Sequence, residues 1–210
     1  MVTEPVTLLT DYALAGLSAC LAFRLRRNLA VSCRFWVTAF IALAIAAFLG
    51  GTFHGFQVAW TWKPTVLSAG VASFGMLAGS AYTTTSGNVR RALLVAAALK
   101  LVFYEAWMLG HDEFIYVVAD TASAMLGVAA LHLLRLDNPA TRWILAGVAV
   151  SLLAAGVQAG RVALHQHFNH NDLYHVVQMA AMLLYYAGVK RMADLNPISA
   201  AESRSPPAKA

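Results

Sequence analysis

The sequence predicts an all-α polytopic membrane protein, a seven-transmembrane helix bundle with its N-terminus outside and its C-terminus in the cytosol. Of 210 residues, 60% are hydrophobic and only 12% are charged, whereas soluble domains carry about 25% charged residues. Seven long apolar segments follow one another along the chain, and basic residues gather in every second loop between them. The composition indicates a membrane protein, and the apolar segments indicate its transmembrane helices. The basic residues indicate how those helices are oriented in the membrane.

Each expected helix is an apolar run long enough to cross the hydrocarbon core of a bilayer, which takes about 20 residues. Short stretches rich in charge, Gly, Pro or Asn separate the runs. The runs cover residues 6–24, 35–57, 65–85, 91–110, 114–134, 143–165 and 171–190. We assign residues 1–192 to one transmembrane domain. Residues 193–210 are rich in Pro, Ser and Ala, so we expect a disordered cytosolic tail.

The basic residues orient the helices. The first, third and fifth loops and the end of the last helix hold ten of them, and the alternate loops hold only Lys63 and Arg161. Cytosolic loops carry such an excess, so the N-terminus is expected outside. The first apolar run lacks a basic leader and is followed by RLRR, as in a retained signal anchor. We expect a multi-pass protein of the bacterial inner (plasma) membrane, and the charge of +5 reflects topology and not nucleic-acid binding.

Apart from Lys100 near mid-helix and His132 at the cytosolic end, the ionisable residues within the apolar runs lie at similar depths when counted from the outer ends of their helices, at about 1.5 Å per residue. Five helices each contribute one such residue: Asp11, His54, Glu105, Asp120 and His175. Ionisable groups in membrane helices are costly and usually face the bundle interior or one another. We therefore expect a shared polar cavity that opens outward. The alternative is a network of hydrogen bonds between helices that binds no ligand.

His175 is the centre of the expected site. Asn171, Asp172 and Gln178 lie three or four residues from it and share its helix face, and a neighbouring carboxylate or amide can orient a metal-bound imidazole. His54 and His175 are the strongest candidate ligands, and His170 is a weaker one. Neither Cys20 nor Cys33 belongs to a pair with the spacing of metal ligands.

The layout resembles the CREST superfamily, which joins alkaline ceramidases, progestin/adipoQ receptors and Per1-type membrane proteins. The stretch GGTFHGF places His54 at the end of the second helix, and NHNDLYH places His175 near the start of the seventh. The resemblance implies zinc held by His54, His175 and a third ligand, for which this chain offers Asn171, His170 or a carboxylate. Thr52 is the hydroxyl closest to the family's serine position, which is Gly50 here, and Asp120 would replace the family's aspartate.

Two classes of function follow. The first is a zinc-dependent intramembrane hydrolase that cleaves a lipid amide or ester, with a metal-bound water as nucleophile and Asp120 or Glu105 as general base. The second is a non-enzymatic membrane sensor or receptor that uses the same cavity. A proton- or ion-coupled transporter, with Asp11, Glu105 and Asp120 as relay, and a haem protein, with His54 and His175 as axial ligands, are further alternatives.

Overall fold

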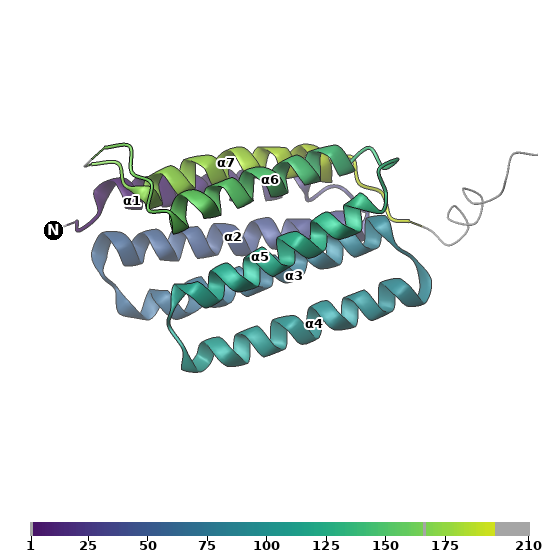
Figure 1. Ribbon diagram of the computed structural model, residues 1–210, viewed down its shortest axis with the longest axis horizontal. Coiled ribbons are helices and arrows are strands. Elements are labelled where there is room, and N and C mark those ends of the chain that lie inside the picture. The colour runs from purple at the N-terminus through teal and green to yellow at the C-terminus, as the bar shows by residue number, and fades with distance from the viewer. Residues whose placement is uncertain (1, 166, 196–210) are drawn as a thin grey trace, which may run out of the picture.

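Seven α-helices and one short 3-10 helix, η1, form the computed structural model over the residues that it describes, 2–165 and 167–195 (Figure 1). The seven expected helices are all confirmed, most with ends within four residues of the expected ones. In chain order they are α1 (Pro5–Leu25), α2 (Val31–Phe56), η1 (Ala59–Thr61), α3 (Trp62–Thr84), α4 (Gly87–Gly110), α5 (Phe114–Leu133), α6 (Thr141–Ala159) and α7 (His170–Val189).

The end of α6 differs most from the expectation, since the helix stops at Ala159 and not near residue 165. Gly160 follows it, and Arg161 adopts a left-handed backbone with φ of 50°. The amide of Val162 then donates to the carbonyl of Val157 at 3.1 Å, which is the bond that closes many helix C-termini. The apolar residues after Arg161 therefore belong to the loop before α7.

Six of the helices form a closed ring. Along the ring, α1 packs on α2, α2 on α3, α3 on α5, α5 on α6, α6 on α7, and α7 returns to α1. Helix α4 lies outside this ring and packs chiefly against α3, at the edge of the bundle in Figure 1. The first and last helices of the chain are therefore neighbours, and their contact closes the ring.

Large side chains fill the centre of the ring, and small residues let the helices approach them. The rings of Trp36 on α2 and Tyr185 on α7 meet with centroids 5.2 Å apart, and both side chains are fully buried. A Cβ atom on Gly147 of α6 would lie 2.6 Å from the Tyr185 ring, and one on Gly79 of α3 would lie 2.4 Å from Trp36. Close packing of this kind is what joins apolar helices in a bilayer, where burial from water contributes little.

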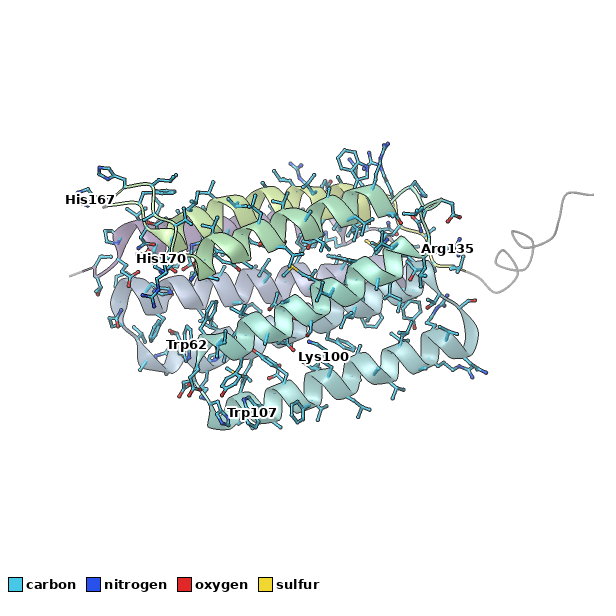
Figure 2. The ribbon with its side chains drawn as sticks, viewed as in Figure 1. Trp62, Lys100, Trp107, Arg135, His167 and His170 are labelled. Carbon is cyan, nitrogen blue, oxygen red and sulfur yellow. The ribbon has the colours of Figure 1, made fainter. Side chains whose placement is uncertain are left out.

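The two ends of the bundle differ in chemistry. Figure 2 shows His167 and His170 at one end, with Trp62 and Trp107, and Arg135 at the other. At the Arg135 end, the side-chain hydrogen bonds from Arg135 to Asp137 lower the pKa of that carboxyl, which lies in the loop before α6. The histidine-rich loops and the arginine-rich loops thus lie at opposite ends of the helices.

The segment after α7 begins as ordered structure, although we expected a disordered tail from residue 193. The Asp194 carboxylate accepts hydrogen bonds from the amides of Val31 and Ser32 at 2.7 and 2.8 Å, and so caps the start of α2. Leu195 donates from its amide to the carbonyl of Tyr82 at 3.0 Å. The rest of the expected tail, 196–210, lies outside the described residues.

Six helical segments are long and apolar enough to cross a membrane by length and composition, within the part of the chain that the structure describes. They are α1, α2, η1 with α3, α4, α5 and α6. Helix α7 is not among them, although its 20 residues match the length of α5. Its first turns carry the polar residues from His170 to Gln178, which lower its mean hydropathy.

We predict that Gly75→Ala destabilises the bundle by about 1–3 kcal/mol, the usual cost of overpacking. The added Cβ would lie 2.6 Å from the carbonyl oxygen of Phe35 and 3.0 Å from the amide nitrogen of Ala39, and backbone atoms of α2 cannot turn away. Gly16→Ala is the matched control, because nothing lies within 4 Å of its added Cβ. Thermal unfolding in detergent micelles measures both. Equal melting temperatures for the two variants would contradict the close α2–α3 packing.

Candidate functional site

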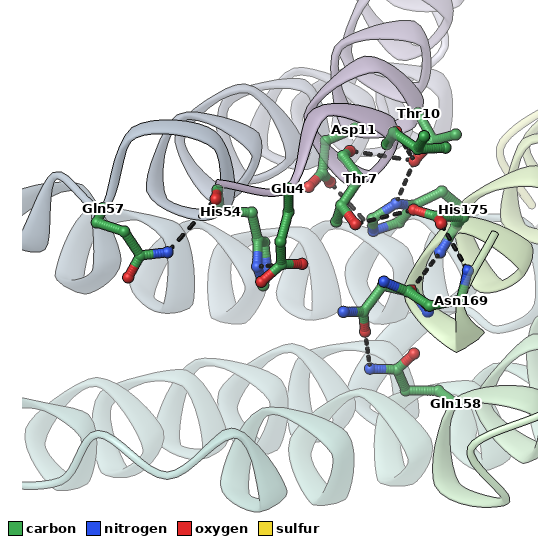
Figure 3. A network of polar contacts seen from close by, with 12 residues as sticks. Glu4, Thr7, Thr10, Asp11, His54, Gln57, Gln158, Asn169 and His175 are labelled. Carbon is green, nitrogen blue, oxygen red and sulfur yellow. Dashed lines mark hydrogen bonds and ion pairs between the residues drawn. The ribbon is translucent and has the colours of Figure 1, made fainter. Parts of the chain in front are cut away.

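Polar side chains join α1 and α7 at the histidine-rich end of the bundle (Figure 3). The Thr7 hydroxyl donates to Asp172 Oδ1 at 2.9 Å. Asp11 Oδ1 lies 3.1 Å from Nε2 of His175, and Thr10 Oγ1 lies 3.0 Å from Nδ1 of the same ring. Asp11, Asp172 and His175 are all buried. These polar groups therefore bond to one another and not to solvent.

Helix geometry explains why these side chains meet. Thr7 and Asp11 are one turn apart on α1 and therefore share a face, as Asp172 and His175 do on α7. The start of α7 is fixed by a capping box, in which the Asn169 side chain accepts from the amides of Asn171 and Asp172 and Asp172 Oδ2 accepts from the Asn169 amide. The hydrogen bond from the Asn169 amide therefore holds Asp172 Oδ2 in place, and Oδ1 of the same carboxylate accepts from Thr7.

His175 has a partner on both ring nitrogens, and both partners come from α1. We expected Asp172 to orient this imidazole, but Thr10 and Asp11 do so. The Thr10 hydroxyl lies 3.1 Å from the carbonyls of Val6 and Thr7, which only accept, so it can donate there and accept from Nδ1. In that tautomer, the 3.1 Å approach of Nε2 and Asp11 Oδ1 holds an additional proton on one of the two groups; in the other tautomer, Thr10 donates to Nδ1 and Nε2–H donates to an ionised Asp11.

His54 forms a second pair of the same kind beside the first. Its Nδ1 lies 3.6 Å from Glu4 Oε2, and the adjoining backbone is tied by a hydrogen bond of 2.9 Å from the Thr3 amide to the Gly55 carbonyl. Figure 3 places His54 and Glu4 at the same end of α1 as the His175 contacts. The end of α2 and the start of α1 therefore join the site, and each of the two expected histidines faces a carboxylate.

The other residues expected near His175 lie around this centre with different partners. Asn171 accepts a hydrogen bond from Gln158 of α6 at 2.7 Å, so it joins α7 to α6 and does not face His54. His170 is the first residue of α7, and its side chain makes no hydrogen bond or ion pair within 2–165 and 167–195. Gln178 is buried one turn beyond His175. The Thr52 hydroxyl lies 3.0 Å from that of Tyr12 and donates to the Phe48 carbonyl.

The expectation of one cavity shared by all five ionisable residues does not match the arrangement. Asp120 pairs with Lys100 of α4, which also donates to the Asp120 carbonyl at 3.0 Å. Glu105 packs against Gly70 of α3. No hydrogen bond or ion pair joins either carboxylate to Asp11, His54 or His175 within the described chain. Similar depth places residues at one level of the bundle, but helix order and rotation decide which of them meet.

The donor chemistry suits a metal ion, but a complete ligand set is not assembled. No group of three or more His, Cys, Asp or Glu side chains surrounds a common point among the residues that the structure describes. The two pairs, Asp11 with His175 and Glu4 with His54, supply two donors each. Catalytic zinc takes three protein ligands, so a zinc ion would need to draw donors from both pairs.

Comparison with known proteins gives the chain its family. The model of a family of unknown function, DUF6962, matches residues 6–194. The chain belongs to this family. The match begins in the first turn of α1 and ends at Asp194, so it covers the closed ring, α4 and the cap on α2. Comparison with curated proteins and with solved structures gave no match.

Sequence reasoning missed three members of the site, Glu4, Thr7 and Thr10. A signal for two of them was present, since Thr7 lies one turn before Asp11 and Thr10 adjoins it, within an otherwise apolar run. Threonine hydroxyls in membrane helices commonly bond to their own backbone, so their type alone does not reveal an inter-helix role. Glu4 precedes α1 and could not be placed near His54 without the closed ring.

We predict that Asp11 and His175 are energetically coupled. The substitutions Asp11→Asn and His175→Gln should each destabilise the protein, and the double variant should lose less than the sum, with a coupling of about 0.5–3 kcal/mol. Unfolding in detergent micelles measures the three variants. The control pairs Asp11→Asn with Asp194→Asn, whose carboxylate caps α2 at the opposite end, and these effects should add. Additive effects for Asp11 and His175 would contradict a direct contact.

Proposed function

We propose that all seven helices span the membrane, with the N-terminus outside and the C-terminus in the cytosol. The position of α7 in the closed ring supports its inclusion, because it packs against both α6 and α1. Its polar residues Asp172, His175 and Gln178 are buried inside the bundle, so they do not meet lipid. The ten basic residues of the Arg135 end supply the orientation.

Reporter fusions test this topology. Fusions at loops near residues 28, 88 and 138 and at the C-terminus should report the cytosol, and one in segment 165–172 should report the outside, as the positive-inside rule requires. Replacing the arginines of the first loop, Arg24, Arg26 and Arg27, by Gln should weaken this preference. A cytosolic signal from 165–172 would contradict both the orientation and an extracytoplasmic site.

We propose that the protein is a proton-responsive membrane protein, in which the state of the Asp11–His175 pair controls the contact between α1 and α7. The observation that carries this proposal is the 3.1 Å approach of Nε2 and Oδ1 between two buried side chains from the two helices that close the ring. A neutral pair avoids an unbalanced charge in a low-dielectric interior. Such a pair is either a protonated aspartate beside a neutral histidine or an ionised aspartate beside a charged histidine. Both hold one proton more than an ionised aspartate beside a neutral histidine.

The surroundings favour that additional proton. The acidic groups at the pair are Asp172 on α7, whose Oδ1 accepts from Thr7, and Glu4 before α1, which faces His54 of α2. Negative charge close by stabilises a positive or neutral state of the pair over a negative one. Asp11 Oδ2 is buried without a hydrogen-bond partner, which also disfavours a fully ionised carboxylate. Loss of the proton would therefore weaken the closure of α1 on α7.

The stability of the protein should fall as the pH rises above about 6.5, where an ordinary imidazole is neutral. The folded pair then holds a proton that the unfolded chain has released, so the free energy of unfolding decreases by up to about 1.4 kcal/mol per pH unit. Asp11→Asn should remove this dependence, whereas Asp137→Asn, in an exposed loop, should keep it. Unfolding and hydrogen exchange in the first turns of α1 and α7 measure the effect; an identical slope in Asp11→Asn would contradict the proposal.

A zinc-dependent hydrolase of lipid amides or esters is the second candidate, and the donor spacing favours it. Two ligands of one tetrahedral zinc ion lie about 3–3.5 Å apart, close to the 3.1 Å of Asp11–His175 and the 3.6 Å of Glu4–His54. Bound zinc would lower the pKa of a water ligand to about 7. Glu4 or Asp172 would then be the nearest carboxylates for a general base, since Asp120 and Glu105 face α4 and α3.

Elemental analysis after incubation with zinc separates the two candidates. The proton-responsive account expects no stoichiometric zinc in the purified protein. One zinc per chain, lost in both His175→Ala and His54→Ala but kept in His132→Ala, would instead establish the hydrolase-type site. His132 is the suitable control because it lies in the last turn of α5 and contacts Thr141 at the opposite end of the bundle.

A further inference from the structure

A hollow of about 340 Å³ opens on the side of the bundle between α4 and α5. Its mouth is apolar and aromatic, with Phe103 73% exposed and Trp107 41% exposed. Helix α4 stands outside the ring and packs chiefly on α3, so the space between α4 and α5 faces the surrounding lipid. The residues that line it are Lys100, Phe103, Tyr104, Trp107, Tyr116, Ala119, Asp120 and Ser123.

The polar end of this hollow has unused hydrogen-bonding capacity. The Lys100 ammonium carries three N–H groups and donates to the carboxylate Oδ1 and the carbonyl of Asp120, which leaves one N–H. Oδ2 of Asp120 is buried without a hydrogen-bond partner, and that side chain is only 5% exposed. The neighbouring Tyr104 and Ser123 hydroxyls donate elsewhere, to the carbonyls of Val66 and Asp120. One acceptor and one donor therefore stand side by side.

The geometry points to a lateral binding site for an apolar molecule that ends in a hydroxyl group. A hydroxyl both donates and accepts, so it can donate to Asp120 Oδ2 while it accepts from Lys100. The rest of the molecule would lie among Phe103, Trp107 and Tyr116 and continue into the bilayer. This site is separate from the Asp11–His175 pair and does not depend on the function proposed for it.

The charges around the hollow favour a neutral ligand group over an ion. A cationic headgroup would meet the Lys100 ammonium, and an anionic one would meet the carboxylate of Asp120. The ion pair is balanced, and one more full charge in this low-dielectric place would be costly. A hydroxyl completes the hydrogen bonds of both partners and adds no charge.

Quenching of Trp107 by a bromine-labelled long-chain alcohol tests the site. The fluorescence of Trp107 is obtained as the difference between the tryptophan fluorescence of the wild-type protein and that of Trp107→Phe, both in detergent micelles. We expect saturable quenching by the alcohol and binding of its methyl ether at least about tenfold weaker, because the ether cannot donate and hydrogen bonds to charged groups have about this effect. Equal binding of alcohol and ether, or no saturable quenching, would overturn the proposal and leave a hollow that holds water.

Two matched substitutions on α5 control for general effects on the protein. Ala119→Leu should fill the hollow and abolish saturable quenching, since Ala119 is exposed and lines it. Ala130→Leu, also exposed on α5 but not part of the lining, should leave quenching unchanged. Equal effects of the two variants would contradict the site. Competition by dioleoylglycerol distinguishes the source: displacement of the alcohol indicates a lipid with a free hydroxyl, and no displacement indicates a free long-chain alcohol.

Discussion

The contact between Asp11 and His175 joins the first helix of the chain to the last, and the arrangement of the bundle depends on it. Apolar packing fills the ring, with glycines that admit rings such as Trp36 and Tyr185, and single polar contacts such as Gln158–Asn171 join other neighbours. The α1–α7 seam adds a cluster of polar contacts near one end, made by Thr7, Thr10, Asp11, Asp172 and His175. In a bilayer these groups have few other partners, so their mutual bonds specify which helices meet.

In the function that we propose, the ionisable groups at this seam make its strength depend on protonation. Apolar contacts do not change between acidic and alkaline conditions, whereas in the function that we propose the pair at Nε2 and Oδ1 gains or loses a proton. The seam also lies at the end opposite the arginine-rich loops, so it would meet the pH of the outer side. A local change there can reach the whole ring, because α1 also packs on α2, and α7 on α6.

Hydrophobicity and breakers predicted the seven helices well, since apolar runs and their Gly, Pro and charged separators depend on local sequence. The end of α6 was missed because apolar residues after Arg161 continue the run although the backbone turns at Gly160. The candidate site was predicted in part. Depth along a helix follows from counting residues, so His175 and Asp11 were expected at one level. Which helices are neighbours does not follow from counting, and Glu105 and Asp120 therefore proved to face α3 and α4.

The most direct measurement of the central claim is the protonation state of the His175 ring in bilayers, by solid-state NMR of nitrogen-labelled histidine with His175→Gln for assignment. The account predicts a ring protonated at Nδ1, with Nε2 in a strong hydrogen bond to a carboxyl group, and a large change in the Nε2 signal in Asp11→Asn. A ring whose two nitrogen signals are the same in wild type and in Asp11→Asn would contradict it.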